Sequence, residues 1–407
     1  MWILLVFEVD QFLAAVTGAP FNRLPTLLAP VLLGFTLFRY KRNTVSWPIV
    51  LFLLMHLSAS IFAENAGLSR NGFKYMFYVT LLGVSTATLI NVPAKLDYIL
   101  KVYLLSFAWF GLFGDFSGGK VWWHQLLGNE DSFGPLMVMA MPIGFFFAQS
   151  TRVPLWRRIG RLVFGLGILG LVVSFARGAA VAGAAVLLYI LVFSPNKTRT
   201  FVSLMVAAII LIPLVAYFVP LDAYLKEVGT SSGGDPVRAH LWGLAVRVWK
   251  TSPWVGVGVN NFGVIGELIA TPEDDAMVWG SIYFRAVHST GFQILAEEGL
   301  VGIGLWLTMI VGFFWRTRQL CRKEAVTAWR ALGGAEFELV HLTRGLEGAM
   351  LGFLLTSIFY NQLYIHWFWS LLTLAFVLHR MTVVSFRRSM PPPGRGGIPA
   401  RISSRPA

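Results

Sequence analysis

The chain has 407 residues and a net charge of +13, with 56% hydrophobic and only 13% charged residues. Together with a mean hydropathy of +0.67, this composition excludes a water-soluble globular protein and predicts several membrane spans. The apolar runs are of helix length and lack the alternation of an outer-membrane barrel, so the expected fold is an all-α membrane bundle. The single cysteine, Cys321, excludes an internal disulfide framework and a cysteine-ligated metal site.

The apolar runs predict the membrane-spanning helices in chain order. They lie near residues 25–40, 45–63, 72–91, 97–114, 133–149, 159–175, 177–193, 201–219, 290–315, 345–361 and 363–384. Residues 2–19 either add another span or lie in the interface, because Glu8 and Asp10 interrupt that run and a carboxylate inside the membrane is costly. We therefore expect a polytopic bundle of about 11–12 spans.

Basic residues fall on alternate connections, which predicts that these connections are cytoplasmic. They are Arg39, Lys41 and Arg42, then Arg152, Arg157, Arg158 and Arg161, then Lys197 and Arg199, then Arg316, Arg318, Arg322 and Lys323, and finally Arg387 and Arg388. Topology and contact with anionic lipid headgroups therefore account for the positive charge, and we expect membrane lipids as partners and no nucleic acid. The opposite, extracytoplasmic face receives the largest polar loop, residues 220–289.

This topology divides the chain into four parts. They are an N-terminal transmembrane bundle at 1–219, a periplasmic loop subdomain at 220–289, C-terminal transmembrane helices at 290–384, and a disordered basic cytoplasmic tail at 385–407.

The large outer loop contains a helix start at Asp235-Pro236, which predicts a helix from Pro236 to about Lys250. Its apolar face should lie along the membrane surface; that face is formed by Leu241, Trp242, Ala245, Val246 and Trp249. Arg238 lies in the first turn, where backbone N–H groups beside a guanidinium form an anion site. The alternative is that Arg238 binds a lipid phosphate or a neighbouring carboxylate.

Two more titratable residues lie on the same face. Arg177 joins two spans with almost no loop, so it needs a carboxylate, a bound anion or ordinary headgroups as its partner. His288 stands where a polar loop meets an apolar span, and it is either an ordinary interfacial histidine or a base that removes a proton from an alcohol. Two cations and one base match transfer from a diphosphate donor, because the cations neutralise the leaving diphosphate and the base activates the acceptor hydroxyl.

Other motifs have less support. Glu273, Asp274 and Asp275 could bind a divalent cation, but consecutive acids in a loop are more often solvated, so we expect no catalytic metal. Residues 256–261 lack the third glycine of a dinucleotide fingerprint, and the chain has neither a P-loop nor a G-x-S-x-G elbow. We expect no cofactor.

Three landmarks, in order, resemble the bacterial O-antigen ligase and polymerase superfamily of polytopic membrane glycosyltransferases. They are Ser174-Phe175-Ala176-Arg177-Gly178; Pro236-Val237-Arg238 through Trp242, with Ser252-Pro253-Trp254-Val255-Gly256-Val257-Gly258 and Phe262; and His288-Ser289 through Leu295, with Glu297, Gly299 and Gly302. The resemblance covers about residues 165–315. Residues 128–134 also resemble the branch associated with exopolysaccharide or protein O-glycosylation systems.

The resemblance implies a metal-independent, inverting transfer on the periplasmic face of the bacterial inner membrane, with an undecaprenyl-diphosphate-linked glycan as the donor. It makes His288 the general base and Arg177 and Arg238 the diphosphate-binding residues. Ser174, Ser289 and Glu297 would be supporting residues, and Arg70, in an outer loop, is a further candidate phosphate contact outside the motifs. Two positions depart from the family pattern, because Ala176 replaces a common serine and Ser289 a common asparagine.

Three functions remain open. A ligase would move the glycan to lipid A core or another glycan or protein acceptor, and a polymerase would use a second lipid-linked unit as the acceptor. A transporter would bind the diphosphate without breaking a bond, but it predicts polar residues through both leaflets, whereas the charges singled out here lie on one face. We favour the ligase.

Overall fold

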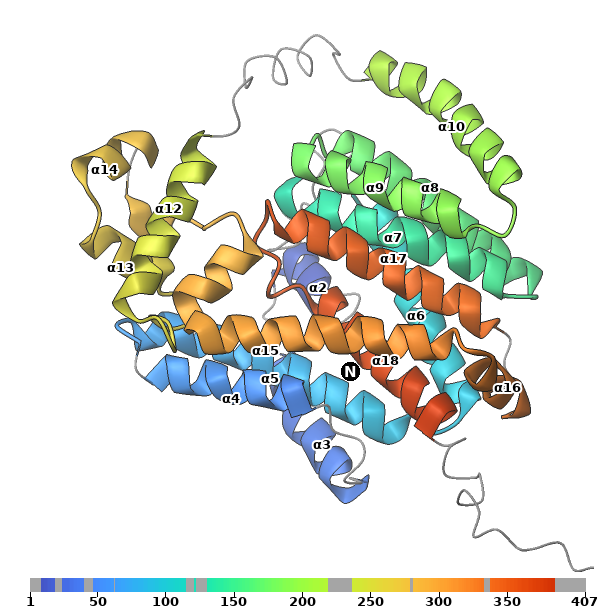
Figure 1. The fold of residues 1–407 in the computed structure, drawn as a ribbon, viewed down its shortest axis with the longest axis horizontal. Helices are drawn as coiled ribbons and strands as arrows, with labels where there is room; N and C mark the ends of the chain where they lie inside the picture. The colour runs from blue at the N-terminus through green and yellow to red at the C-terminus, as the bar shows by residue number, and fades with distance from the viewer. Residues whose placement is uncertain are drawn as a thin grey trace, which may run out of the picture.

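The computed structural model describes residues 9–18, 24–39, 47–61, 63–114, 121, 130–218, 236–278, 281–332 and 337–384. These residues form helices joined by short connections, which confirms the all-α fold (Figure 1). The helices up to residue 218 are α2 (Val9–Thr17), α3 (Leu24–Arg39), α4 (Trp47–Ile61), α5 (Ala66–Leu89), α6 (Pro93–Leu112), α7 (Glu130–Ser150), α8 (Pro154–Val173), α9 (Arg177–Phe193) and α10 (Lys197–Phe218). The later ones are α12 (Pro236–Thr251), α13 (Phe262–Leu268), α14 (Pro272–Val278), η3 (Ile282–Phe284), α15 (Thr290–Leu320), α16 (Lys323–Ala331), α17 (Leu339–Ser357), α18 (His366–His379) and η4 (Arg380–Val384).

Every run predicted to span the membrane contains a helix, but several helices begin before the apolar run does. Helix α5 begins at Ala66, where the Asn65 side chain accepts a hydrogen bond from the N–H of Leu68. Helix α17 begins at Leu339, six residues ahead of the predicted run at 345–361. Hydropathy does not detect such turns, because the residues that cap and open a helix are polar. The tail at 385–407 and residues 2–8 lie outside the described residues.

The helices pack in two neighbouring groups. Helices α7, α8, α9 and α17 pack together with α6, and α3, α4, α5, α15 and α18 form the second group (Figure 1). Helices α7 and α8 approach at Gly144 and Gly160, where a Cβ atom on Gly144 would lie 2.7 Å from the carbonyl oxygen of Gly160. Small residues at such a crossing allow two backbones to touch, as in helix pairs within membranes.

Helices α12, α13, α14 and η3 form a small subdomain at one end of the molecule (Figure 1). Its core contains Leu241, Leu244 and Val248 of α12 together with Phe262 and Ile282. Of the face that was expected to lie along the membrane surface, Leu241 and Ala245 are buried, while Trp242, Val246 and Trp249 are half-buried. Part of that face therefore packs against protein, since α12 contacts α13 and α15. The predicted helix itself is confirmed, from Pro236 to Thr251.

Two described helical stretches, Ser132–Ser150 and Thr290–Leu320, are long and apolar enough to cross a membrane. Shorter apolar stretches occur at Leu28–Phe38, Ile49–Ile61 and Arg177–Phe193. Length and composition are the basis of this assignment.

Candidate active site

Arg177 is the first residue of α9 and follows a sharp reversal of the chain after α8. Phe175 adopts a left-handed conformation, with φ of 52°. Buried Ser174 stabilises the reversal, because its hydroxyl donates to the carbonyl of Leu171 and accepts from the N–H of Ala176. The reversal leaves Arg177 exposed in the first turn of α9, where backbone N–H groups favour an anion.

Arg238 lies in the first turn of α12, as the sequence predicted, and it is half-buried. Its guanidinium carbon is 5.4 Å from the ring centroid of Tyr360, a residue of the link between α17 and α18. A guanidinium at this distance from an aromatic ring makes a cation–π contact. The contact attaches the start of the loop subdomain to the helical bundle.

His288 directly precedes the N-cap of α15 and is half-buried. Its φ of 53° is left-handed, a conformation that costs roughly 1–3 kcal/mol for a residue other than glycine. The surrounding structure must enforce this conformation. The N–H of Ser289 donates to Asn361 Oδ1 at 2.9 Å, and the hydroxyl of Thr290 donates to the carbonyl of Tyr360 at 2.8 Å.

Residues 360–362, which we name the Tyr360 segment, contact all three parts of the site. The N–H of Gly178, next to Arg177, donates to Tyr360 Oη at 3.1 Å. Arg238 packs on the same ring, and the residues after His288 bond to the segment's backbone and to Asn361. The structure therefore brings the segments that carry Arg177, Arg238 and His288 to one short link.

Sequence reasoning missed the Tyr360 segment. The signal was present, because Tyr360, Asn361 and Gln362 are consecutive polar residues between two apolar runs. We interpreted this place only as the boundary between two predicted spans. Gln362 also contributes, since its N–H donates to the hydroxyl of Thr290 at 2.8 Å.

Helix α15 is broken at Gly299, which has φ of 66° and ψ of −161°. The segment that contains Gly256 and Gly258 fills the break on both sides. The N–H of Gly258 donates to the carbonyl of Glu297, and the N–H of Leu300 donates to the carbonyl of Pro253. A Cβ atom on Gly299 would lie 2.5 Å from the carbonyl oxygen of Trp254, so the close approach requires glycine. The segment around Gly256 and Gly258 therefore packs directly into the break of α15 at Gly299. We call this contact region the joint.

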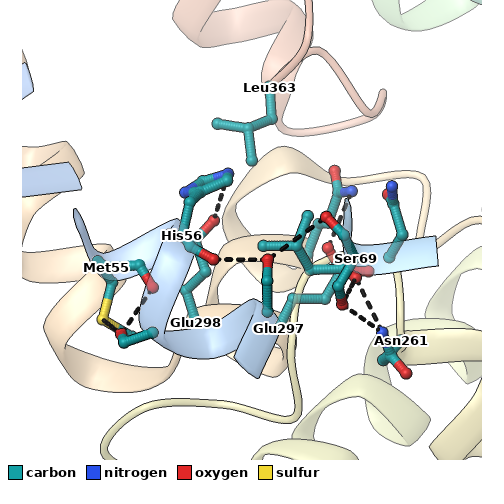
Figure 2. A network of polar contacts seen from close by, with 12 residues as sticks. Met55, His56, Ser69, Asn261, Glu297, Glu298 and Leu363 are labelled. Atoms are coloured by element: carbon teal, nitrogen blue, oxygen red, sulfur yellow. Dashed lines mark hydrogen bonds and ion pairs between the residues drawn. The ribbon is translucent and has the colours of Figure 1, made fainter. Parts of the chain in front are cut away.

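Glu297 is buried at this joint, with 3% of its surface exposed. Its carboxylate accepts a hydrogen bond from the N–H of Phe262, the first residue of α13, and one from the side-chain amide of Gln293. Through its contact with Phe262, Glu297 connects α15 to the loop subdomain. Figure 2 shows the neighbouring Glu298 turned toward His56 of α4.

Arg70 is exposed on the second turn of α5. The neighbouring Ser69 donates its hydroxyl to the carbonyl of Val259 at 2.6 Å and accepts from the side-chain amide of Asn261 (Figure 2). These contacts connect the Arg70 helix to residues 259–261, and the connection does not pass through Tyr360.

The acidic run lies in α14 and not in a loop; Glu273 and Asp275 are exposed, as we expected, but Asp274 is not. Asp274 is fully buried and accepts hydrogen bonds from His240, Arg247 and Thr271. Burial on its own would raise the pKa of Asp274, but these hydrogen bonds lower the pKa well below its ordinary value. Asp274 is a structural residue that attaches α14 to α12.

Comparison with known protein families gives a match to part of the chain. A family model described as O-antigen ligase matches residues 162–307, a range that includes Arg177, Arg238 and His288. No curated protein matches the chain. Over residues 162–307, the match confirms the resemblance to the O-antigen ligase and polymerase superfamily.

Proposed function

We propose that this protein is an O-antigen ligase-like glycosyltransferase. It moves a glycan from an undecaprenyl-diphosphate carrier to an acceptor hydroxyl, on lipid A core or another acceptor. The family match supports a function of ligase or polymerase type. The observation that carries the proposal is the meeting of the Arg177, Arg238 and His288 segments at residues 360–362.

The proposed reaction is a single displacement at the anomeric carbon of the first sugar. The acceptor oxygen forms a bond to this carbon while the bond from the carbon to the diphosphate oxygen breaks, which inverts the configuration. His288 takes the proton of the acceptor hydroxyl, and the electron pair of the broken bond leaves with the carrier diphosphate. Arg177 and Arg238 neutralise the negative charge on the leaving group, and the proposed mechanism uses no metal.

The proposed location is the bacterial inner membrane, with the site on the periplasmic face. The alternating basic loops support this orientation. The two helical stretches of membrane length support only the location in a membrane. We propose the division into bundle, loop subdomain and C-terminal helices at 220 and 290, with about 11–12 spans. The part of α15 that follows the break at Gly299, up to Leu320, is long enough to cross a bilayer by itself.

The test is transfer in vitro from a purified polyprenyl-diphosphate glycan, with lipid A core and a second lipid-linked glycan as separate acceptors. The protein is compared with H288A and with the control H341A, which changes a histidine of α17 that pairs with Glu338. We expect transfer to lipid A core that H288A abolishes and H341A keeps.

Other outcomes would change the assignment. A ladder of products on the carrier would identify a polymerase with the same site. If no acceptor releases the carrier diphosphate, the enzyme proposal fails and transport becomes the favoured function. Wild-type rates in H288A would exclude His288 as the base.

A further inference from the structure

Tyr360 is a buried aromatic residue in the link between α17 and α18, with 2% of its surface exposed. It lies outside the range of the family match, which ends at residue 307. Three different parts of this residue contact the three segments of the candidate site: the phenol oxygen, the ring face and the backbone carbonyl.

The phenol oxygen fixes the beginning of α9. The N-cap of this helix is Ala176, which has no side-chain oxygen to accept a hydrogen bond from the first turn. Gly178 is buried, and its N–H donates to Tyr360 Oη at 3.1 Å. Tyr360 therefore takes the place of the missing cap and fixes the turn from which Arg177 projects.

The ring face fixes Arg238. The guanidinium lies over the ring at 5.4 Å from its centroid, so movement of the ring also moves the cation. One rigid side chain therefore contacts Arg238 and the helix turn of Arg177 at the same time. Two cations that bind one diphosphate group need a fixed separation, and one rigid side chain shared by both elements is suited to provide it.

The backbone of the same residue holds the His288 segment. The Tyr360 carbonyl accepts from the hydroxyl of Thr290, and this hydroxyl accepts in turn from the N–H of Gln362. On the side of the link, these hydrogen bonds involve main-chain atoms only, so a substitution of the Tyr360 side chain does not remove them. The side chain of Tyr360 therefore affects the two arginines selectively.

We propose that the Tyr360 side chain is the positioning residue of the arginine pair: it sets the separation of Arg177 and Arg238 so that both bind one diphosphate. The inference rests on the proposed function for the identity of the donor. Because Tyr360 is buried, it acts through the arginines, and the acceptor site does not depend on it. Removal of the Tyr360 side chain should therefore weaken donor binding and slow the departure of the leaving group. The acceptor KM should stay unchanged.

The experiment compares Y360F, which removes only the hydroxyl, with Y360L, which also removes the ring face. The matched control is Y364F, because Tyr364 lies in the same link and its buried hydroxyl makes no hydrogen bond within the described structure. We expect kcat/KM for the donor to fall about tenfold in Y360F and about a hundredfold in Y360L, with the acceptor KM within about twofold of wild type. Y364F should stay within about twofold on both measures.

A double-mutant cycle with Arg238 separates positioning from general stability. In the R238A background, Y360L should have a much smaller effect than in the wild-type background, because the partner of the ring is already absent. Fully multiplicative effects of Y360L and R238A, or wild-type donor kinetics in Y360F, would overturn the proposal. A rise in the acceptor KM alone would do the same.

Binding of undecaprenyl diphosphate itself, measured in nanodiscs, keeps the two proposals apart. If the protein transfers no glycan, the transferase assignment is contradicted. If Y360L nevertheless binds undecaprenyl diphosphate more weakly than Y364F does, Tyr360 is still supported as the positioning residue. Equal binding and equal transfer by Y360L and Y364F would contradict the role of Tyr360 and leave the transferase assignment intact.

Discussion

The imidazole Nε2 of His240 lies 2.5 Å from the carboxylate Oδ1 of Asp274, and this contact attaches α14 to α12. The hydrogen bonds on this carboxylate outweigh the effect of its burial, so the pKa of Asp274 lies well below the ordinary value. His240 is two residues from Arg238. The attachment therefore stabilises the helix that carries a proposed diphosphate-binding residue.

The pH dependence of stability follows from the low pKa of Asp274. A carboxyl group with a lower pKa in the folded state than in the unfolded state contributes stability above the unfolded value, about 3.9, and loses it as pH falls toward the folded value. We expect the thermal midpoint of wild type to exceed that of D274N at pH 5 to 8, with the difference shrinking below about pH 4. Thermal unfolding in nanodiscs across this range tests it, and a difference that is constant down to pH 3 would contradict the assignment.

The break at Gly299 predicts opposite effects for two glycine substitutions in α15. G299A places a methyl group against the backbone of Trp254 in a conformation that favours glycine, and we expect it to destabilise the protein by about 3 kcal/mol or more and to abolish transfer. G304A enters open space on the helix and should be neutral or stabilising by up to about 1 kcal/mol. Thermal unfolding and transfer assays of the two variants give the comparison. Similar stability of the two would contradict the described break.

The contact between His56 and Glu298 predicts a coupled pair. The His56 Nε2 and Glu298 Oε1 atoms lie 3.2 Å apart and both side chains are fully buried, yet neither side chain completes a hydrogen bond within the described structure. Removal of one partner leaves a buried polar group alone, so H56L and E298L should each destabilise by about 3–5 kcal/mol, and the double variant by less than their sum. Additive losses in equilibrium unfolding would show that the two residues do not interact.

The exposed arginines should differ in their importance for the donor. R177A removes a charge from the first turn of α9 and should lower kcat/KM for the donor by about 10- to 150-fold, the range for a lost charge-assisted hydrogen bond. R70A should lower it by less than about fivefold, because the Arg70 helix connects to residues 259–261 and not to Tyr360. R158A, on the exposed surface of α8, is the control for loss of one positive charge. An R70A effect as large as that of R177A would place Arg70 among the main diphosphate contacts.

The fold was predicted from hydropathy. The observed helices differ from the predicted spans where polar residues take part in helices. Apolar runs located the helices because a span must be apolar along its length. The apolar runs missed the first turns of α5 and α17. They also could not show the break of α15, because Gly299 looks in the sequence like any glycine within a helix, and only the segment packed against it in space causes the break. The Gly256 segment that fills this break is more than forty residues away in sequence.

In the candidate site, too, contacts between residues that are distant in the chain could not be predicted from the sequence. Arg177, Arg238 and His288 were selected because charged groups beside apolar spans are unusual. Tyr360 escaped selection because a tyrosine at the end of a span is common, and its importance comes from contacts with Gly178, Arg238 and Thr290, which are distant in the chain. The burial of α12 was also missed, because an amphipathic helix has the same sequence pattern whether it lies on protein or on lipid.

The position of Tyr360 has a consequence for engineering. To alter the acceptor or sugar preference of the proposed transferase, one would exchange the matched region, residues 162–307, for that of a relative. Such a chimera would place a foreign arginine turn and a foreign histidine segment against residues 360–362 of this chain, which hold both by specific hydrogen bonds. The part of the chain that has to be exchanged as a unit is therefore discontinuous in sequence: the link between α17 and α18 has to be exchanged together with residues 162–307.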